Sequence, residues 1–264
     1  MRYAAASICI LLAGAAAAQP PPGSGRGGRG MPPRDIEAEM RSPQPRVVTP
    51  GEEPRLPPSD AVILFDGKDM SQWTVRDGSP AGCKVQNGEM LCASGVGNIF
   101  SKPTFRSAQI HVEYAPPDMP ARRQNGQIDP QVKGNSGVYL QGRYEIQILD
   151  SYNNPTYTDG SNGALYRVAA PMVNASRPPT EWQVFDIIFR APKCEGGNLV
   201  SPGSVTELHN GVLTLENVSL RPRQTCEQGV GEPGPLMLQD HEPNGPPTTM
   251  KFRNIWFRRL EDQK

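Results

Sequence analysis

GNSGVYLQGRYEIQILD, residues 134–150 of the chain, reads as two short β-strands joined by a Gln-Gly turn. Successive side chains of a strand point to opposite faces, so Glu145 and Gln147 share one face while the isoleucines between them point into a core. Strict alternation places Asp150 on the opposite face, and it joins Glu145 only if the strand bulges or ends near Leu149. The stretch therefore predicts a strand that presents an acid and an amide to a cleft.

Other short alternating or apolar runs recur with turn residues between them. They span residues 61–65, 97–101, 105–114, 136–140, 144–149, 181–190, 204–208, 212–220 and 250–260. Helical periodicity over ten or more residues is not found in this part of the sequence. The pattern predicts a single all-β sandwich, whose long Gly- and Pro-rich loops are the usual place for a binding site.

The N-terminal part differs in composition from the rest. Residues 1–18 have one early arginine, a short apolar run and a small-residue end, which is typical of a secretory signal peptide; a buried N-terminal helix is the alternative. Residues 19–58 are rich in Pro, Gly and Arg, and we expect a disordered linker. Residues 59–264 form the predicted domain, and the expected location is secreted or periplasmic.

Charge and hydropathy exclude several partners. The 264 residues carry 27 basic and 27 acidic side chains, which gives a net charge of zero. This balance favours neither nucleic acid nor an anionic membrane surface as a partner. The apolar run of the leader is too short to span a bilayer, so we expect no membrane insertion. The oligomeric state is left open.

Four cysteines remain after the predicted leader, an even number that suits an oxidising compartment. An Asn-Gly turn lies between Cys83 and Cys92, so these two are expected to face each other across a hairpin. Cys194 is then left to pair with Cys226. Their spacing fits no zinc ligand set.

Eight motifs carry a resemblance to a known family. The first is ILFDGKDMSQW at residues 63–73, and the others follow in order at 134–139, 144–150, 163–166, 181–182, 209–211, 238–241 and 252–256. Together they resemble the 3-keto-disaccharide hydrolase family (DUF1080) of carbohydrate-active hydrolases, over about residues 60–260. The resemblance implies a concanavalin A-like jelly-roll sandwich of two antiparallel sheets, with a carbohydrate site on its concave face. It also implies glycoside substrates whose glucose ring is oxidised at C3.

The chemistry of such substrates predicts the content of the site. A ketone at C3 acidifies the C2 proton, so cleavage needs a base, a group that stabilises an enolate oxygen and an acid for the leaving oxygen. Glu145, Asp150 and His241 are the predicted catalytic residues. The predicted substrate-binding residues are Asn135, Tyr139, Gln147, Trp182, Gln239, Asp240 and Arg253.

Several candidates have plain structural alternatives. Asp150 is equally suited to cap the turn that follows its strand, Arg253 is as readily one half of a structural ion pair, and tryptophans are more often core residues than sugar platforms. No cofactor is firmly implied. A divalent cation held by Glu145, Asp240 and His241, or calcium held by loop oxygens, is left open.

Two other functions compete with cleavage of a 3-keto-glycoside. Retaining family 16 glycosidases carry Glu-x-Asp-x-x-Glu on a sheet of the same fold, and Glu145, Gln147 and Asp150 occupy the same offsets. However, Gln147 lacks the charge of the middle Asp, and the shorter Asp150 would lie too far from Glu145, since a retaining pair needs about 5 to 5.5 Å. A non-catalytic sugar-binding module is the third interpretation, because this sandwich is a common lectin scaffold.

Overall fold

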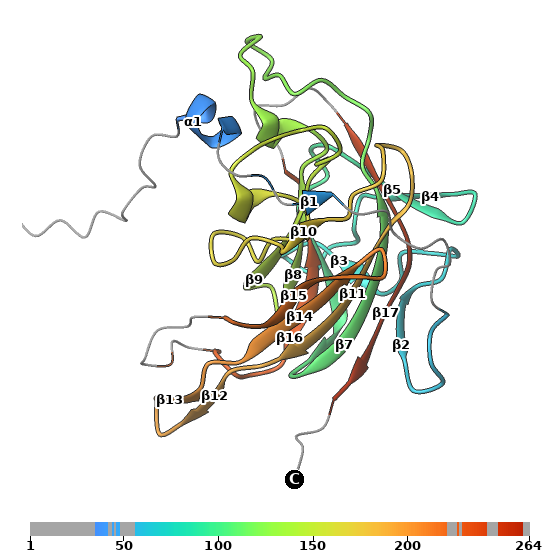
Figure 1. The fold of residues 1–264 in the computed structure, drawn as a ribbon. Helices are drawn as coiled ribbons and strands as arrows, with labels where there is room; N and C mark the ends of the chain where they lie inside the picture. Colours follow the sequence, from blue (N-terminus) through green and yellow to red (C-terminus); the bar gives the residue numbers. More distant parts are fainter. Residues whose placement is uncertain are drawn as a thin grey trace, which may run out of the picture. The chain divides into compact units, whose positions relative to one another are not determined.

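The computed structural model describes residues 35–41, 44, 46–47, 56–220, 226, 229–241 and 248–260. All of them belong to one compact unit, Asp35–Lys264. The predicted signal peptide and most of the predicted linker lie outside the described residues. Within this unit the regular secondary structure is almost entirely β-strand, arranged in two large antiparallel sheets, so the jelly-roll prediction is confirmed (Figure 1).

The larger sheet has eight strands. Its path runs β15-β14-β11-β7-β17-β5-β4, and β2 also pairs with β17. The strands are β2 (Val62–Phe65), β4 (Lys84–Gln86), β5 (Glu89–Ala93), β7 (Ala108–Ala115), β11 (Gln183–Arg190), β14 (Ser204–His209), β15 (Val212–Ser219) and β17 (Thr249–Arg259).

The smaller sheet has five strands in the order β3-β6-β16-β8-β9. They are β3 (Trp73–Thr74), β6 (Ile99–Phe105), β8 (Ser136–Leu140), β9 (Tyr144–Ile148) and β16 (Gly234–Leu238). Strands β8 and β9 are the two predicted from residues 134–150. The residues between them include Gln141 and Gly142, both at positive φ (55° and 65°), so a glycine suits the second position of this turn.

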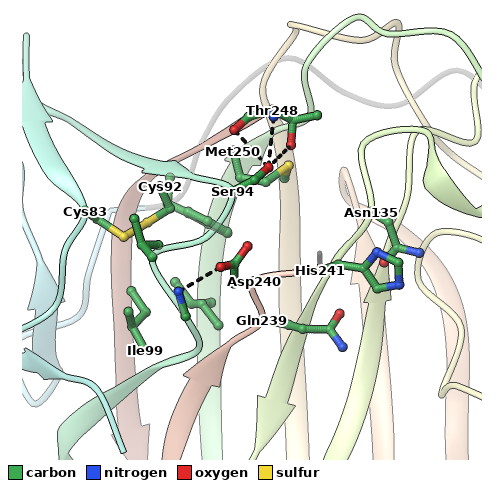
Figure 2. A pocket seen from close by; sticks show the side chains of 14 residues that line it. Cys83, Cys92, Ser94, Ile99, Asn135, Gln239, Asp240, His241, Thr248 and Met250 are labelled. Atoms are coloured by element: carbon green, nitrogen blue, oxygen red, sulfur yellow. Dashed lines mark hydrogen bonds between the residues drawn. A yellow bond between two sulfur atoms is a disulfide. The ribbon is translucent and has the colours of Figure 1, made fainter. Parts of the chain in front are cut away.

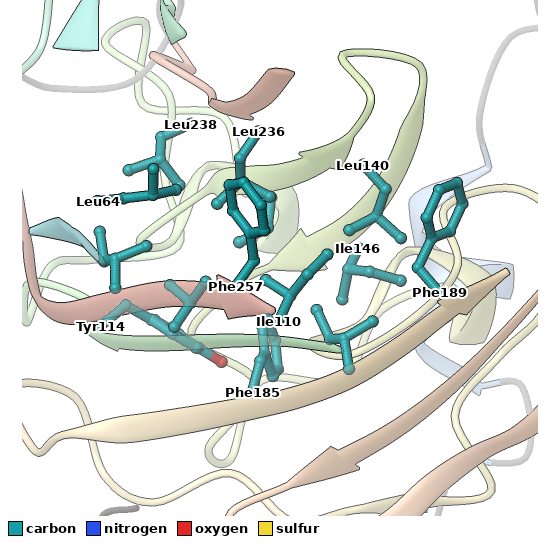
Figure 3. Close-up of a cluster of buried hydrophobic side chains, with 14 of the residues drawn as sticks. Leu64, Ile110, Tyr114, Leu140, Ile146, Phe185, Phe189, Leu236, Leu238 and Phe257 are labelled. Atoms are coloured by element: carbon teal, nitrogen blue, oxygen red, sulfur yellow. The ribbon is translucent and has the colours of Figure 1, made fainter. Parts of the chain in front are cut away.

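The core lies between the two sheets. Figure 3 shows Ile110, Phe185 and Phe257 of the larger sheet meeting Leu140 and Ile146 of the smaller one. All five are buried, because alternate side chains of each strand point inward. The opposite faces of the same strands are then left for polar side chains.

Minor elements lie outside the two sheets. They are helix α1 (Ile36–Arg41), the parallel pair β1 (Arg46–Val47) with β10 (Val173–Asn174), the hairpin of β12 (Lys193–Glu195) with β13 (Asn198–Ser201), and the 3-10 turns η1 (Pro130–Val132) and η2 (Thr158–Gly160). Helix α1 and strand β1 fall inside the predicted linker. The C-terminal part of that segment therefore contains regular structure, and it contacts the sandwich through the pairing of β1 with β10.

Both predicted disulfides are present. Cys83 is bonded to Cys92 and Cys194 to Cys226. The first pair closes the hairpin of β4 and β5, whose turn residues Asn87 and Gly88 both have positive φ. Two disulfides suggest an extracellular or periplasmic protein. In the part of the chain that the structure describes, no helix is long and apolar enough to cross a membrane.

Candidate active site

A polar surface covers the outer face of the five-stranded sheet around Glu145. Strand β8 pairs with β9 so that Tyr139 lies opposite Glu145 and Gly137 opposite Gln147. Their neighbours Ile146 and Ile148 are fully buried in the core. These four residues therefore project away from the core, as the alternation of residues 134–150 predicted. We call this surface, together with Asn135 and Gln239, the Glu145 face.

Glu145 is half-buried on this face, and its carboxyl group is a weaker acid than an exposed glutamate. Removal from water raises the pKa of its carboxyl group to about 7, although a hydrogen bond from the Tyr139 hydroxyl partly opposes the shift. Tyr139 also accepts a hydrogen bond from Gln239 Nε2 at 3.1 Å. Burial beside Glu145 raises the pKa of the Tyr139 phenol, which therefore stays protonated. The pair thus holds a carboxyl group poised near neutral pH beside a neutral hydroxyl donor.

Gly137 provides the room for this arrangement. A Cβ atom at this position would lie 2.6 Å from Glu145 Oε1 and 2.9 Å from Tyr139 Cε2. Both distances are shorter than any ordinary contact, so the carboxyl group occupies the space that a side chain would need. Glycine is used here for close approach and not for a special backbone angle.

Amide side chains line the next part of the face. Gln147 is buried, and its Nε2 donates to Asn135 Oδ1 at 3.3 Å. Asn135 Nδ2 in turn donates to the carbonyl oxygen of Gln131 at 2.6 Å. These bonds fix the orientation of both amides, which is what selective recognition of sugar hydroxyls requires.

The residues that follow β16 extend the Glu145 face. The backbone N–H of Gln239 donates to the carbonyl oxygen of Gly137 at 2.9 Å, which ties this segment to β8. Figure 2 shows Asn135, Gln239 and His241 pointing to one side of the strand end, while Asp240 points to the other. His241 is exposed. The His241 side chain therefore lies on the same side as the predicted amides, whereas the Asp240 side chain points away from them.

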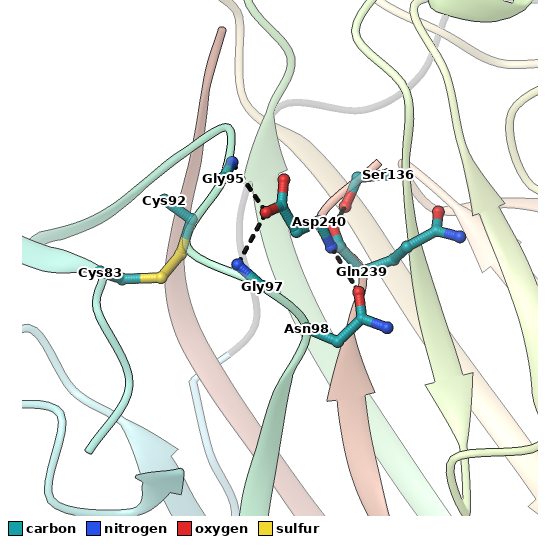
Figure 4. Close-up of a disulfide and its surroundings, with 8 residues drawn as sticks. All are labelled: Cys83, Cys92, Gly95, Gly97, Asn98, Ser136, Gln239 and Asp240. Atoms are coloured by element: carbon teal, nitrogen blue, oxygen red, sulfur yellow. Dashed lines mark hydrogen bonds between the residues drawn. A yellow bond between two sulfur atoms is a disulfide. The ribbon is translucent and has the colours of Figure 1, made fainter. Parts of the chain in front are cut away.

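Asp240 anchors a neighbouring turn (Figure 4). Its Oδ2 accepts hydrogen bonds from the backbone N–H groups of Gly95 at 2.9 Å and Gly97 at 2.7 Å. Its own N–H donates to Asn98 Oδ1 at 2.9 Å. The Cys83–Cys92 disulfide lies beside this turn. Asp240 was predicted to contact substrate, but its Oδ2 is engaged by the turn, so its contribution is to hold the segment between Gln239 and His241.

Asp150 lies beyond the end of β9, which stops at Ile148. Its Oδ2 is 2.9 Å from Lys133 Nζ, and its Oδ1 accepts from the Tyr152 N–H at 3.1 Å. Burial raises the pKa of the Asp150 carboxyl group, and Lys133 opposes that shift. These contacts match the capping alternative for Asp150, and they give it partners other than Glu145.

Arg253 and Trp182, two of the predicted substrate contacts, belong to the other sheet. Arg253 lies on β17 and pairs in register with Glu113 of β7; its Nε donates to Glu113 Oε2 at 2.6 Å. Its guanidinium stacks on the Trp182 ring at 4.0 Å. Glu113 continues into a buried network in which His111 Nδ1 is 2.8 Å from Asp186 Oδ1. Arg253 and Trp182 therefore lie on the outer face of the eight-stranded sheet and not beside Glu145 on β9, which matches the structural ion-pair alternative for Arg253.

The metal set that the sequence left open, Glu145 with Asp240 and His241, is not assembled in the described part of the chain. Among the described residues, no group of three or more His, Cys, Asp or Glu side chains is arranged to hold a metal ion. Glu145 lies on β9 beside Tyr139, and Asp240 is bonded to the glycine turn. Neither residue is thus placed to share an ion with His241.

The sequence interpretation did not select three residues that border the face. Gly137 was quoted only as part of a strand, although its position two residues before a tyrosine on the same face was a usable signal. Tyr166 lies next to Glu145, since its backbone N–H donates to the Glu145 carbonyl oxygen at 3.0 Å. It ends the motif at residues 163–166. Arg167 follows it, and no pattern in the sequence indicated a role for that residue.

A carboxyl group, a phenol and fixed amides on one face of a two-layer sandwich are polar groups of the kind that a carbohydrate site uses. Together with the family and the solved structures that the chain matches, they identify a carbohydrate-active protein of the glycosyl hydrolase kind. Residues 60–258 match the family described as the 3-keto-alpha-glucoside-1,2-lyase-like domain, and the chain belongs to this family.

Solved structures agree with this assignment. A provisionally assigned glycosyl hydrolase from Parabacteroides distasonis is 37% identical to this chain; the match covers 85% of this chain and 95% of that one, with a TM-score of 0.70. A second protein from that organism, with the same provisional assignment, is 17% identical over 76% of this chain and 94% of its own, with a TM-score of 0.53, and supports the fold alone. Comparison with curated proteins finds no significant match.

Proposed function

We propose that this protein cleaves the glycosidic bond of 3-keto-glucosides by elimination across C1 and C2, with Glu145 as the base. The observation that carries the proposal is the Glu145–Tyr139 pair, in which burial brings the pKa of the carboxyl group to about 7. A base of this strength is about half ionised at pH 7 and still strong enough to remove a proton next to a ketone. The family description, which names a 1,2-lyase, supports elimination as the type of reaction.

The atoms and electrons of this reaction balance with Glu145, the substrate and water. Glu145 takes the C2 proton, and the electron pair of that C–H bond forms the enolate of the C3 ketone. The enolate then expels the oxygen at C1, which leaves a C1–C2 double bond conjugated with the ketone. The leaving oxygen takes up one proton, and water added across the double bond completes a net hydrolysis.

The neighbours of Glu145 suit the remaining tasks. The Tyr139 hydroxyl is a neutral donor within reach of the same carboxyl group, so we assign it to the developing enolate oxygen. Gln147, Asn135 and Gln239 hold sugar hydroxyls. His241, on the exposed side of the face, donates a hydrogen bond from its neutral ring to the leaving oxygen, because desolvation lowers the pKa of its imidazole, and solvent water supplies the proton. Asp150 has no part in this scheme, since Lys133 and the Tyr152 N–H engage its carboxylate.

The proposed setting is outside the cytoplasm. The residues 1–18 have the composition of a signal peptide, and two disulfides favour an oxidising compartment. In this setting the protein would meet oxidised glycosides before uptake.

The test compares Glu145→Gln with the wild-type protein on a 3-keto-glucose disaccharide. The variant keeps the shape of the side chain and removes the base, so kcat should fall at least about 100-fold while substrate binding is retained. Exchange of the C2 proton with solvent deuterium, followed by NMR, reports the first step directly and should stop. Glu216→Gln is the matched control, because Glu216 is an exposed acid on β15 of the other sheet.

Two results would reject the proposal. One is a Glu145→Gln variant that still exchanges the C2 proton at the wild-type rate. The other is cleavage of the unoxidised disaccharide by the wild-type protein at a comparable rate, which would point to a classical glycosidase.

A further inference from the structure

The chain continues the Glu145 face beyond β9 through a short paired segment. Gln147 N–H donates to the Ala164 carbonyl oxygen at 2.9 Å, and Ile146 and Leu165 form an antiparallel bridge with both side chains in the core. Tyr166, the next residue, must then point to the outer side, as Glu145 does. Neighbouring strands lie about 4.8 Å apart, so Tyr166 stands one strand spacing from Glu145.

Tyr166 belongs to a polar aromatic group. Its hydroxyl is 2.8 Å from the hydroxyl of Tyr157, which donates to Gln131 Oε1 at 3.0 Å. The Arg167 guanidinium lies over the Tyr157 ring at 4.0 Å and is 5.8 Å from the centre of the Tyr166 ring. Gln131 also accepts from Asn135 through its carbonyl oxygen, so this group is continuous with the Glu145 face.

Arg167 has two features that its local contacts do not explain. Its backbone has φ of 59°, the left-handed region that an arginine rarely adopts, and this turns the side chain back over Tyr157. Its Nε is buried and has no hydrogen-bond partner among the described residues. The ion pair with Asp159 is long, at 3.5 Å, and 30% of the arginine side chain is exposed. The buried Nε is out of reach of a ligand, but the exposed part of the guanidinium, loosely paired with Asp159, is suited to donate to a ligand oxygen.

We infer that Tyr166 and Arg167 form the subsite for the leaving sugar, with Arg167 donating to its oxygen atoms. This inference rests on the proposed function and adds to it the residues that select the leaving group. The position supports it, because Tyr166 lies about one strand spacing from Glu145, the proposed base. The planar fork of arginine matches paired oxygens such as neighbouring hydroxyls, which an aryl group lacks.

The experiment measures kcat/KM on two substrates, a 3-keto-glucose disaccharide and a 3-keto aryl glucoside. Arg167→Asn removes the guanidinium and keeps a residue that tolerates left-handed backbone. It should lower kcat/KM at least about tenfold on the disaccharide and less than about twofold on the aryl glucoside. Arg167→Lys should give an intermediate loss on the disaccharide, because it keeps the charge without the fork.

Arg258→Lys is the control, because Arg258 lies on the other sheet, where it pairs with Asp60. This variant should change kcat/KM equally little on both substrates. Equal losses on both substrates with Arg167→Asn would mean that Arg167 acts on the shape of the Glu145 site, and would overturn the inference. Unchanged activity on both would overturn it as well. A melting temperature close to that of the wild type shows that the variant is folded.

The inference and the proposed function can fail separately. If the wild-type protein cleaves neither substrate, the proposed function has failed, and the subsite is then tested by calorimetric binding of an unoxidised glucose disaccharide. Arg167→Asn should weaken that binding about tenfold. Equal affinity for the variant and the wild-type protein, or no binding to either, would overturn the inference by itself.

Discussion

Replacement of Gly137 by alanine tests the geometry around Glu145 most directly. The new Cβ would lie 2.6 Å from Glu145 Oε1, whereas an ordinary contact begins near 3.4 Å, so the carboxyl group must retreat by roughly 0.8 Å. The Tyr139 ring must also shift, since its Cε2 is 2.9 Å away. The end of a glutamate side chain is flexible, and the backbone of Gly137 has no positive φ, so the fold should tolerate the change.

The expected effect is on activity more than on stability. A misplacement of about 1 Å at a catalytic group costs about 100-fold in rate, so Gly137→Ala should lower kcat by roughly this factor. Crowding of about 1 kcal/mol corresponds to a loss of only about 2–4 °C in melting temperature for a domain of this size. The displaced carboxyl group also gains water, so its pKa should fall from about 7 toward 4.5, as measured by carbon NMR titration.

The control is Gly82→Ala, a glycine whose added Cβ meets only Val96 at 3.5 Å. This variant should keep wild-type kinetics. A Gly137→Ala variant with kcat within twofold of the wild type and an unchanged Glu145 pKa would show that the carboxyl group does not occupy this space. The reasoning about the Glu145 face would then be refuted.

Three further predictions concern the acidic residues Glu145, Asp240 and Glu207, the last of them buried on β14. The kcat/KM of the wild-type protein should rise with pH and level off above about 7, because only ionised Glu145 can accept a proton; a profile without this step would exclude Glu145 as the base. Asp240→Ala leaves two backbone N–H groups without their acceptor and frees the segment before His241, so kcat should fall at least about tenfold, whereas Asp240→Asn, whose amide oxygen still accepts, should recover most of it. Burial raises the pKa of Glu207 to about 8, so the folded state retains a proton that the unfolded chain loses above about 4.5. Its contribution to stability is therefore largest below about pH 4.5 and is lost as the pH rises toward 8. Glu207→Gln should raise the melting temperature more at pH 8 than at pH 5. An equal change at both pH values would contradict this account.

Sequence patterns predicted the fold well where local rules decide it. Strand β8 matches the predicted range of residues 136–140, and β9 ends one residue before the predicted end. Strand β16 was missed, because Gly234 and Pro235 at its start are residues that disfavour strands. Its five residues are held by β6 and β8 on either side, which are tertiary partners that a local pattern does not contain.

In the candidate site, too, some features are set by local sequence and others by tertiary contacts. The sequence by itself determined that Glu145 and Gln147 share a face, because a strand alternates its side chains whatever it packs against. It also determined the pairing of Cys83 with Cys92, because a two-residue turn sets the register of its own hairpin. Both features depend on residues close together in the chain.

Only the tertiary structure decided which distant residues join Glu145. It brought Gln239 to Tyr139 across 100 residues, and it placed Arg253 on the opposite sheet. Both outcomes depend on the order of strands within the two sheets, and the local alternation of apolar and polar residues does not determine that order. Tertiary packing also raised the pKa of Glu145, because the shift comes from burial, and burial is a property of the assembled sheets and not of the strand.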